Sequence, residues 1–369
     1  MKLLLINNGA ALYRQGIYKL MDKEFGCDWV FGKTDDDIRQ MDFSVLKGHV
    51  TLGRIRQLFN GKLYWQKDVV KQIFKDYSHY IVIGEERNLS VWIFLLFSLF
   101  TRKKKVYFWT HGAYGKEHGI KLFVSNTFAR MTDGSFVYSN YARGILIKRG
   151  FAPERIFTIH NSLDYDMQIE LRNSGLSSDV YARHFGNNNP VVIFIGRLTT
   201  VKKLDMLIDA IARLREEGKH YNLVFVGNGS ERQVLSEQVK ILGLNDSVWF
   251  YGACYDEKTN AELIYNADIC VAPGNVGLTA MHTMVFGTPV ISHNNFPYQM
   301  PEFEAIHPGE TGDFFEYDSV DSLAQVIDEW LNHHKDREAI RQACYKEIDT
   351  QWNPLYQIEV LKKGLAIVN

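Results

Sequence analysis

Short, continuous apolar segments alternate with longer mixed segments along the chain, and this pattern constrains the fold most strongly. Segments such as 2–6 (KLLLI) and 191–196 (VVIFIG) lack the polar alternation of a strand with one exposed face. Continuous runs of this length are typical of strands that helices cover on both faces, as in parallel sheets. The predicted strands lie at 2–6, 27–31, 80–84, 106–110, 135–139, 156–160, 191–196, 222–227, 248–252, 268–273, 288–292 and 312–316.

The longer segments between these strands predict amphipathic helices. In the first clear example, one face is formed by Leu204, Leu207, Ile208, Ile211 and Leu214. Gly218 is expected to end this helix, and Ser230 with Gln233 has the spacing of a capping box that opens the next one. A later stripe consists of Leu323, Val326, Ile327 and Trp330, and the tail 352–365 is also expected to be helical. Strands and helices that alternate in this way predict an α/β fold.

A chain of 369 residues favours about two domains, and the predicted strands form two successive arrays. The polar, small-residue segment between the arrays, 166–189, is the predicted linker. We therefore expect two doubly wound, Rossmann-like domains at 1–165 and 190–351, which face each other across a cleft. The helix within 352–369 is expected to pack back on the first domain.

Charge and cysteine composition exclude several classes of function. The 42 Lys and Arg residues nearly balance the 43 Asp and Glu residues, so the chain lacks the basic surplus of a nucleic-acid binder. Cys27, Cys254, Cys270 and Cys344 form no CxxC pair, and no Cys/His group has zinc spacing. Neither a disulfide framework nor a metal site is therefore expected, and a reducing cytoplasm fits this composition.

The apolar content of the chain predicts no membrane-spanning segment. The N-terminus does not resemble a signal peptide, because its apolar run ends at Ile6. The longest apolar run, 91–100, has ten residues, whereas a spanning helix needs about 20. Basic residues follow this run, namely Arg102, Lys103, Lys104 and Lys105. The stretch 91–105 is expected either to touch an anionic membrane surface or to form a buried connecting helix.

The loops that follow the strands are the candidate ligand site, because open α/β sheets bind ligands beyond the carboxyl ends of their strands. The loop 196–203 (GRLTTVKK) brings Arg197 and Lys202 to this edge. Two fixed cations suit a diphosphate, whose negative charges lie on closely spaced oxygens. Two solvated surface charges are the alternative interpretation.

The stretch PGNVGLTAMHTMVFGTPVIS is the most informative one. Gly274 and Gly277 permit a ligand to approach the backbone closely. A helix is expected to begin near Leu278, and its amides and positive dipole end would favour an anion. Asn275 could bond a hydroxyl group, and His282 lies one turn into the helix, where a structural role is the alternative.

Three weaker signals follow other strands. His111 comes directly after the strand 106–110 and could transfer a proton or bond a hydroxyl group. The amides around Gly227 and Gly229 could meet an anion, although a plain strand–helix turn explains them equally well. Glu302 and Glu304 could hold hydroxyl groups, and ordinary loop charges are the alternative.

Taken in order, the segments GRLTTVKK, LVFVGNGS, VWFYG, NADICVAPGNVGL, FGTPVIS and PEFEAIHPGETG resemble the retaining glycosyltransferases of family 4 (glycosyl transferases group 1), which have the GT-B fold. The segments WTHG (109–112), YSN (138–140) and HNSLD (160–164) also look like family positions. The resemblance covers nearly the whole chain and is strongest from 190 to 316.

The resemblance implies transfer of a sugar from a nucleotide-diphosphate donor to an acceptor hydroxyl, with retention of the anomeric configuration and without a metal or cofactor. Arg197 and Lys202 would hold the diphosphate and stabilise the departing charge. Together with His111, near the donor sugar, they form the implied catalytic set. The implied donor-binding set is Gly9, Gly227, Gly229, Asn275, Gly277, Leu278, Thr279, His282 and Glu302.

The resemblance also implies a role for each domain. The region 1–165 would be the acceptor side, and 190–351 would bind the nucleotide sugar. A carbohydrate or glycolipid acceptor and a place in bacterial surface polysaccharide or glycoconjugate synthesis are expected. The expected location is the cytoplasm, with peripheral contact to the inner face of the membrane through 91–105.

The chain departs from the family pattern at two glutamates that are normally separated by seven residues. Alignment on GL and FGTPV places Gly274 and His282 there, and Lys203 replaces a glycine. The alternative is therefore a catalytically silent nucleotide-sugar-binding or scaffold protein. A nicotinamide-dependent oxidoreductase is disfavoured, because NNGAALYRQG after the first strand is not GxGxxG. A phosphorylase of this fold is disfavoured by the short chain and the lack of an obvious cofactor lysine.

Overall fold

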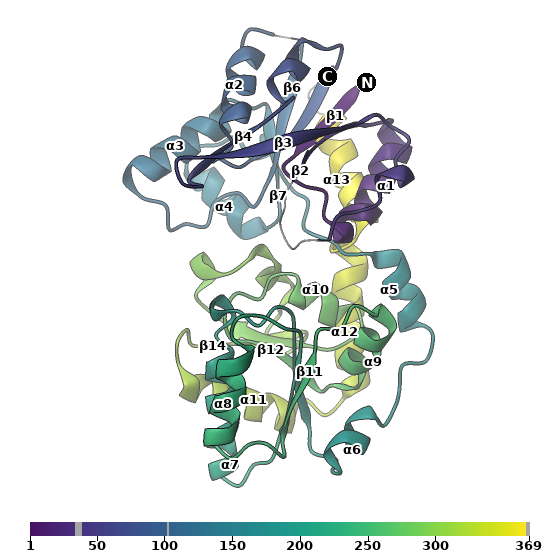
Figure 1. Ribbon diagram of the computed structural model, residues 1–369, viewed down its shortest axis with the longest axis vertical. Coiled ribbons are helices and arrows are strands. Elements are labelled where there is room, and N and C mark those ends of the chain that lie inside the picture. Colours follow the sequence, from purple (N-terminus) through teal and green to yellow (C-terminus); the bar gives the residue numbers. More distant parts are fainter. Residues whose placement is uncertain (34–38, 102, 367–369) are drawn as a thin grey trace. The chain divides into compact units, whose positions relative to one another are not determined.

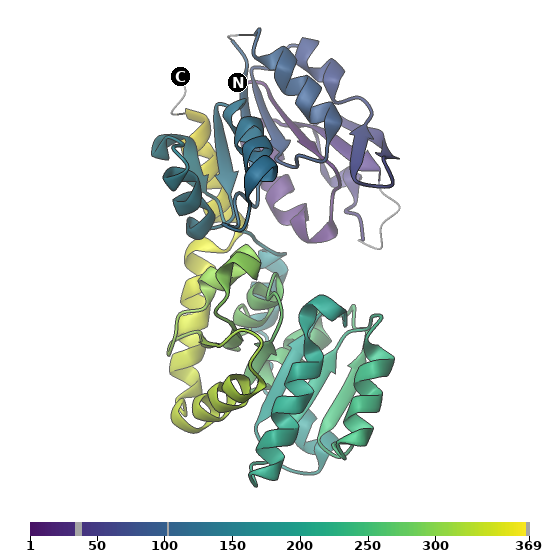
Figure 2. The same ribbon diagram turned by 90° about the vertical axis from the view of Figure 1, so that its left-hand side faces the viewer.

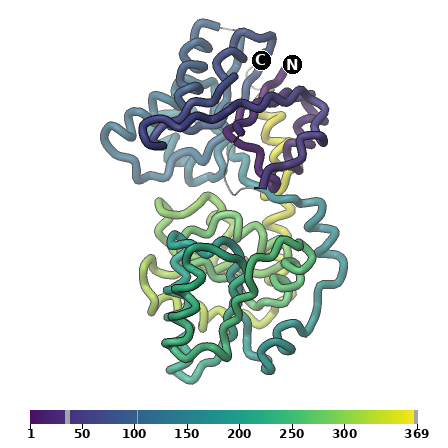
Figure 3. The backbone as a smooth tube through the Cα atoms, in the orientation of Figure 1, coloured from purple at the N-terminus to yellow at the C-terminus, as the bar shows by residue number. Residues whose placement is uncertain are grey.

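The computed structural model describes residues 1–33, 39–101 and 103–366. The chain divides into two compact units (Figure 1). Unit 1 comprises Met1–Asp164 and Asn353–Asn369, and unit 2 comprises Tyr165–Trp352. The tube in Figure 3 traces the C-terminal segment, drawn in yellow, from unit 2 into unit 1. Each unit contains a β-sheet with helices packed on it.

The sheet of unit 1 has eight strands in the order β4-β3-β2-β1-β5-β6-β7-β8. Neighbouring strands are parallel except for the antiparallel pair β3 and β4. The strands are β1 (Leu3–Asn7), β2 (Asp28–Lys33), β3 (Val50–Leu58), β4 (Leu63–Gln66), β5 (His79–Ile83), β6 (Lys105–Thr110), β7 (Gly134–Val137) and β8 (Ile156–Thr158). The strand order reverses at β1, so the edge beyond β1 and β5 is the topological position for a ligand.

Alternate side chains of β1 enter two different cores of unit 1. Leu3 and Leu5 pack with α1 and α13, which lie side by side in Figure 1. Leu4 and Ile6 pack with α2 and α3 on the other face. The helices of unit 1 are α1 (Gln15–Phe25), α2 (Leu89–Ser98), α3 (Gly119–Arg130), α4 (Asn140–Lys148) and α13 (Pro354–Ala366). Burial on both faces explains why these strands are apolar throughout.

The sheet of unit 2 has six parallel strands in the order β11-β10-β9-β12-β13-β14. The strands are β9 (Val191–Ile195), β10 (Asn222–Val226), β11 (Val248–Gly252), β12 (Ile269–Ala272), β13 (Val290–His293) and β14 (Gly312–Phe315). The helices are α5 (Tyr165–Arg172), α6 (Val180–Phe185), α7 (Leu204–Glu216), α8 (Arg232–Ile241), α9 (Glu257–Asn266), α10 (Thr279–Met284), α11 (Val320–His333) and α12 (Arg337–Gln351), and Figure 2 shows them flanking the strands. The strand order reverses at β9, between β10 and β12.

All the strands predicted from the sequence are present, with ends that differ by at most two residues. The predicted buried face of α7 is confirmed, and Gly218 follows this helix in a left-handed conformation. The sequence analysis missed β3 and β4. Most side chains of β3 are exposed or half-exposed, so the strand carries no continuous apolar signal.

The predicted capping box of α8 is wrong. This helix begins at Arg232, and its N-cap is Glu231, which makes no capping hydrogen bond through its side chain. The segment 166–189, interpreted from the sequence as a linker, contains most of α5 and all of α6, and both helices pack against α9. Arg102 of the predicted basic stretch lies outside the described residues.

Candidate functional site

Two loops meet at the carboxyl edge of the unit 2 sheet because β9 and β12 are neighbours. The loop after β9 carries Arg197 and Lys202, and the loop after β12 begins at Pro273. The Gly274 N–H donates to the Lys202 carbonyl at 2.9 Å, which fixes the two loops together. The fold therefore brings the two most informative sequence segments into one site.

Lys202 is held at the centre of this site. Its Nζ donates to the carbonyl oxygen of Asn275 at 2.7 Å and to Asn275 Oδ1 at 2.9 Å. The pKa of Lys202 is lowered to about 8, chiefly by burial; the charge of Glu302 opposes this, and the charge of Arg197 adds to it. Lys202 thus combines partial desolvation with a charge that an anionic ligand would stabilise.

The charges around Lys202 differ in their exposure. Arg197 is exposed, and no acidic side chain pairs with it in the described parts of the chain. Glu302 is only 1% exposed and lies in the short helix Pro301–Ala305. The buried carboxylate acts on Lys202 from within the protein, whereas Arg197 faces solvent. An anion at this edge would meet two cations.

Backbone amides complete the site at the start of α10. A Cβ placed on Gly277 would lie 3.8 Å from Lys202 Nζ, so the ammonium group is close to this loop. Among the described residues, the amides of Gly277 and Leu278 have no hydrogen-bond acceptor. Thr279 Oγ1 donates to the Ile195 carbonyl at 3.0 Å, which fixes α10 to the end of β9. The open amides beside Lys202 suit phosphate oxygens.

Gln299 organises the same loop and was missed by the sequence analysis. Its Oε1 accepts the Val276 N–H at 3.0 Å, and its Nε2 donates to Ser292 Oγ at 2.7 Å and to the His293 carbonyl at 3.1 Å. Gln299 is 2% exposed, so all three bonds are shielded from water. A lone loop glutamine gives no sequence signal for this role, because its partners are backbone and hydroxyl groups from other elements.

Gly274 and His282, at the two positions where the resemblance implied glutamate, both make close contacts within unit 2. A Cβ on Gly274 would lie 2.0 Å from the Val201 carbonyl oxygen, so this backbone leaves no room for a side chain. His282 Nε2 lies 2.9 Å from Glu257 Oε1, and Gln168 Nε2 also donates to that oxygen at 2.9 Å. Burial raises the pKa of Glu257, but His282 and the amide donors outweigh this and hold the pKa below its usual value. A carboxylate from α9 therefore lies beside His282.

Gly227 and Gly229 have a packing role. A Cβ on Gly227 would lie 1.9 Å from the Gly196 carbonyl oxygen, and a Cβ on Gly229 would lie 2.2 Å from the Leu198 carbonyl oxygen. The turn after β10 therefore lies directly against the loop that carries Arg197. These glycines shape the cation loop through close backbone approach.

Unit 1 contains a separate cavity of about 480 Å³ at the carboxyl ends of β1, β5, β6 and β7. It includes the predicted residues Gly9 and His111. Its lining is completed by Asn7, Asn8, Ala11, Tyr13, Arg14, Gln40, Ile83, Gly84, Glu85, Trp109, Thr110 and Tyr138. The cavity lies where the strand order of this sheet reverses, which is the position expected for a ligand.

His111 lies in this cavity beside Arg14. Its ring is in contact with the rings of Tyr138, at 5.1 Å between centroids, and Tyr114, at 6.4 Å. The pKa of His111 is lowered to about 4, mainly by desolvation from the surrounding protein atoms and secondly by the positive charge of Arg14. His111 is therefore neutral at physiological pH and can both donate and accept a hydrogen bond.

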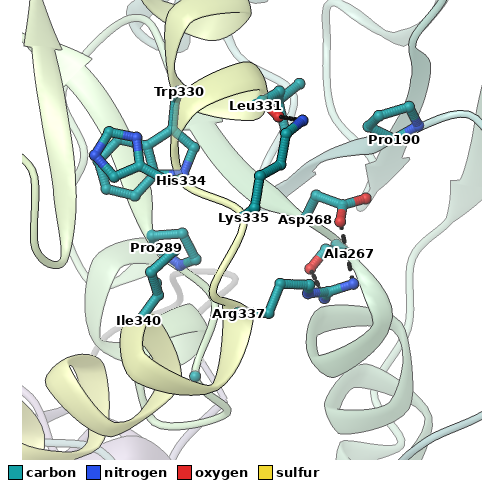
Figure 4. Close-up of a pocket in the computed structure, with 11 residues that line it drawn as sticks. Pro190, Ala267, Asp268, Pro289, Trp330, Leu331, His334, Lys335, Arg337 and Ile340 are labelled. Carbon is teal, nitrogen blue, oxygen red and sulfur yellow. Dashed lines mark hydrogen bonds and ion pairs between the residues drawn. The ribbon is translucent and has the colours of Figure 1, made fainter.

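A smaller pocket of about 140 Å³ lies at the amino ends of the unit 2 strands (Figure 4). In it Arg337 pairs with Asp268 at 3.1 Å and donates to the Ala267 carbonyl at 2.7 Å. The rings of Trp330 and His334 stack at 3.9 Å. None of the predicted site residues lines this pocket.

No helix within 1–33, 39–101 and 103–366 is long and apolar enough to cross a bilayer. In the same residues, no group of three or more His, Cys, Asp and Glu side chains is arranged to hold a metal ion.

Comparison with solved structures assigns the fold to the GT-B class, with two Rossmann-like parallel sheets. The chain is similar to Anabaena Alr3699/HepE, solved in complex with UDP (TM-score 0.73, 17% identity, 100% of each chain). It is also similar to the lipopolysaccharide outer core galactosyltransferase WaaB (TM-score 0.73, 16% identity, 100% of each chain).

The sequence comparisons concern unit 2. Residues 182–347 match the family model for glycosyl transferases group 1. Mannosylfructose-phosphate synthase of Agrobacterium fabrum is 33% identical over 129 residues, which are 32% of this chain and 28% of the relative. The GDP-mannose-dependent alpha-(1-6)-phosphatidylinositol dimannoside mannosyltransferase of Mycobacterium tuberculosis is 33% identical over 104 residues, 27% of this chain and 26% of the relative. The chain thus matches little more than a quarter of the length of these curated relatives.

Proposed function

We propose that the chain is a glycosyltransferase that moves a sugar from a nucleotide-diphosphate sugar to an acceptor hydroxyl, with retention of the anomeric configuration. The observation that carries the proposal is the position of Lys202 beside Arg197 and the open amides of Gly277 and Leu278. The match of 182–347 to glycosyl transferases group 1 supports it, since this segment contains all four residues.

The site can stabilise the leaving group of this reaction. When the bond between the anomeric carbon and the phosphate oxygen breaks, negative charge grows on the diphosphate. Lys202 and Arg197 would stabilise that charge, and the acceptor oxygen would bond to the anomeric carbon while its proton passes to the departing diphosphate oxygen. Because two protein cations supply the charge, the proposal includes no resident metal or cofactor.

Asn275 and Glu302 would prepare Lys202 for the donor. The ammonium group donates hydrogen bonds to both oxygens of Asn275, and the negative charge of Glu302 raises its pKa. A bound diphosphate would raise the pKa of Lys202 and keep it protonated during the reaction. Asn275 Oδ1 would then be able to accept a bond from a hydroxyl group of the donor sugar.

A nucleotide-release assay tests the proposal. UDP-, GDP-, ADP- and TDP-sugars are incubated with the protein, with and without carbohydrate acceptors. Lys202→Ala or Arg197→Ala is expected to lower turnover by about 100-fold or more. Lys240→Ala, which removes an exposed lysine at the end of α8, is the matched control. Unchanged rates in both site variants would overturn the assignment.

The acceptor in this proposal is a carbohydrate or glycolipid, in bacterial surface polysaccharide or glycoconjugate synthesis. Relatives named as a lipopolysaccharide galactosyltransferase and a phosphatidylinositol dimannoside mannosyltransferase support this class. We also propose a cytoplasmic location with peripheral membrane contact. Support comes from the exposed Phe97 and Phe100, which precede Lys103, although Phe94 and Leu95 of the same stretch are buried.

A catalytically silent nucleotide-sugar-binding protein is the second candidate. The lack of space at Gly274 favours it, because the family carboxylate cannot be present there without movement of the loop. Binding of a nucleotide sugar without any nucleotide release, with every acceptor tried, would support this candidate against the first.

A further inference from the structure

Arg14 places a cation in the wall of the unit 1 cavity. Its guanidinium donates to the Tyr138 hydroxyl and lies over the rings of Tyr138, at 5.5 Å, and Trp109, at 5.6 Å. No carboxylate contacts Arg14 in the described parts of the chain. Partial burial of an unpaired charge is unfavourable, so a ligand that supplies a negative charge would be bound preferentially.

The other described polar groups of the cavity do not neutralise the positive charge of Arg14. Glu85, the one acid among the described residues of the lining, accepts hydrogen bonds from Asn8 at 2.9 Å and from Tyr64 at 2.8 Å, and it lies 3.8 Å from Arg87. Glu85 therefore has partners of its own and makes no ion pair with Arg14.

Trp109 forms part of the cavity wall beside Arg14. Its side chain is only 6% exposed, and its Nε1 atom is buried. The contribution of Trp109 to the cavity is therefore its ring, over which the Arg14 guanidinium lies at 5.6 Å. The rings of Trp109 and Tyr138 thus hold the charge of Arg14 at the cavity wall.

We propose that the unit 1 cavity binds an anionic carbohydrate, whose carboxylate or phosphate group is held by Arg14 beside the rings of Trp109 and Tyr138. A guanidinium binds either group through two parallel hydrogen bonds. The aromatic side chain of Tyr13 and the cavity volume of about 480 Å³ suit a sugar ring that carries such a group. The statement that the acceptor of the reaction is acidic rests on the proposed function. The binding of an anionic carbohydrate in this cavity does not depend on that function.

Binding of small probes tests the inference without any transfer reaction. Dissociation constants for glucuronic acid, glucose 6-phosphate and glucose are measured by saturation-transfer NMR. We expect at least one of the two acids to bind more tightly than glucose, and the comparison of the acids separates a carboxylate site from a phosphate site. Arg14→Gln is expected to weaken binding of the preferred acid by about tenfold or more and to leave glucose unchanged, since charged hydrogen bonds are the strong ones.

Three further variants keep the test decisive. Arg14→Lys retains the charge and should retain part of the affinity, which also provides a readout if Arg14→Gln fails to fold. Trp109→Phe should weaken the acid by a smaller factor. Arg130→Gln removes an exposed arginine of unit 1 at the end of α3, outside the cavity lining, and should change nothing.

Several outcomes overturn the inference. Equal affinities for the acids and glucose, no binding of either acid, or no effect of Arg14→Gln on the preferred acid would each do so. So would a loss of UDP binding in Arg14→Gln with acid binding intact, since Arg14 would then serve the nucleotide. Absence of nucleotide release from the intact protein removes the transferase assignment alone, whereas absence of acid binding removes this inference alone.

Discussion

Lys202 Nζ donates to both oxygens of Asn275, at 2.7 Å to the backbone carbonyl and at 2.9 Å to Oδ1. The lysine follows β9 and the asparagine follows β12, so the contact exists only because these strands are neighbours. Asn275 therefore acts as a positioning residue for the cation that would meet the diphosphate.

Asn275→Ala should lower kcat/KM for the donor by about 5- to 30-fold. The variant removes one of the two acceptors, worth about 1–2 kcal/mol for a charged donor, and leaves the backbone carbonyl in place. Steady-state kinetics with the preferred nucleotide sugar measure the effect. Asn332→Ala, an exposed asparagine of α11, serves as the control. Equal kinetics in the two variants would show that Asn275 does not position Lys202.

Transfer should fail at high pH because of Lys202. Its pKa is lowered to about 8, and the protonated form is the one that binds phosphate, so activity is lost as the pH rises through this value. We expect kcat/KM for the donor to fall about tenfold for each pH unit above 8, because this parameter reports the free enzyme. In Lys202→Arg the side chain stays charged, so the decline should disappear even if the maximum rate is lower. A decline that persists unchanged in this variant would assign it to another group.

The strands were predictable because a strand that is buried on both faces, such as β9 or β12, has a continuous apolar sequence. Strand β3 was not, since Arg54 and Arg56 interrupt it and most of its side chains are exposed or half-exposed. The same contrast holds in the site. Arg197 and Lys202 stand in one recognisable loop, and the topology that joins them to Asn275 followed from the strand pattern.

The supporting residues of the site could not be predicted. Glu257 reaches His282 from another helix, 25 positions away, and Gln299 reaches Val276 across 23 positions. Their roles depend on loop conformations that no local pattern specifies. That no described carboxylate contacts Arg14 was not predictable for the same reason, because it depends on where the carboxylates of unit 1 lie.

Gly229→Ala should destabilise unit 2 by about 2 kcal/mol or more, because the new Cβ would lie 2.2 Å from the Leu198 carbonyl oxygen and force two loops apart. Urea unfolding measures the change. Gly144→Ala is the control, since this glycine lies inside α4 with nothing within 4 Å of a Cβ, and the change should be neutral or slightly stabilising. Similar unfolding midpoints for Gly229→Ala and the parent protein would contradict the close approach of the two loops.

The exposed end of the stretch 91–105 should bind anionic vesicles. Lys104 donates to Tyr80 and Lys105 pairs with Asp133, so Lys103 is the cleaner charge to remove. The double variant Phe100→Ser with Lys103→Ser should lower sedimentation with phosphatidylglycerol vesicles by about tenfold or more.

Two controls define the membrane test. Ile241→Ser removes an apolar side chain of unit 2 that is 77% exposed, and it should leave vesicle binding unchanged. Vesicles of phosphatidylcholine alone should bind the parent protein weakly. Equal sedimentation of the parent protein and the double variant with anionic vesicles would contradict the proposed membrane contact.

Arg14→Gln should raise the pKa of His111. Burial is the larger cause of its low pKa of about 4, and the charge of Arg14 is the second, so removal of the charge should move the pKa upward while leaving it below the ordinary value. Titration of the imidazole signals by NMR measures this. Arg130→Gln, at the end of α3, should leave the titration unchanged.

Because the folded-state pKa of His111 lies below that of the unfolded chain, neutral His111 contributes no penalty above pH 7, and stability is lost as the pH falls below the ordinary pKa of histidine. The variant should lose less stability on acidification than the parent protein does; an identical pKa in both would show that Arg14 and His111 do not share the cavity in solution.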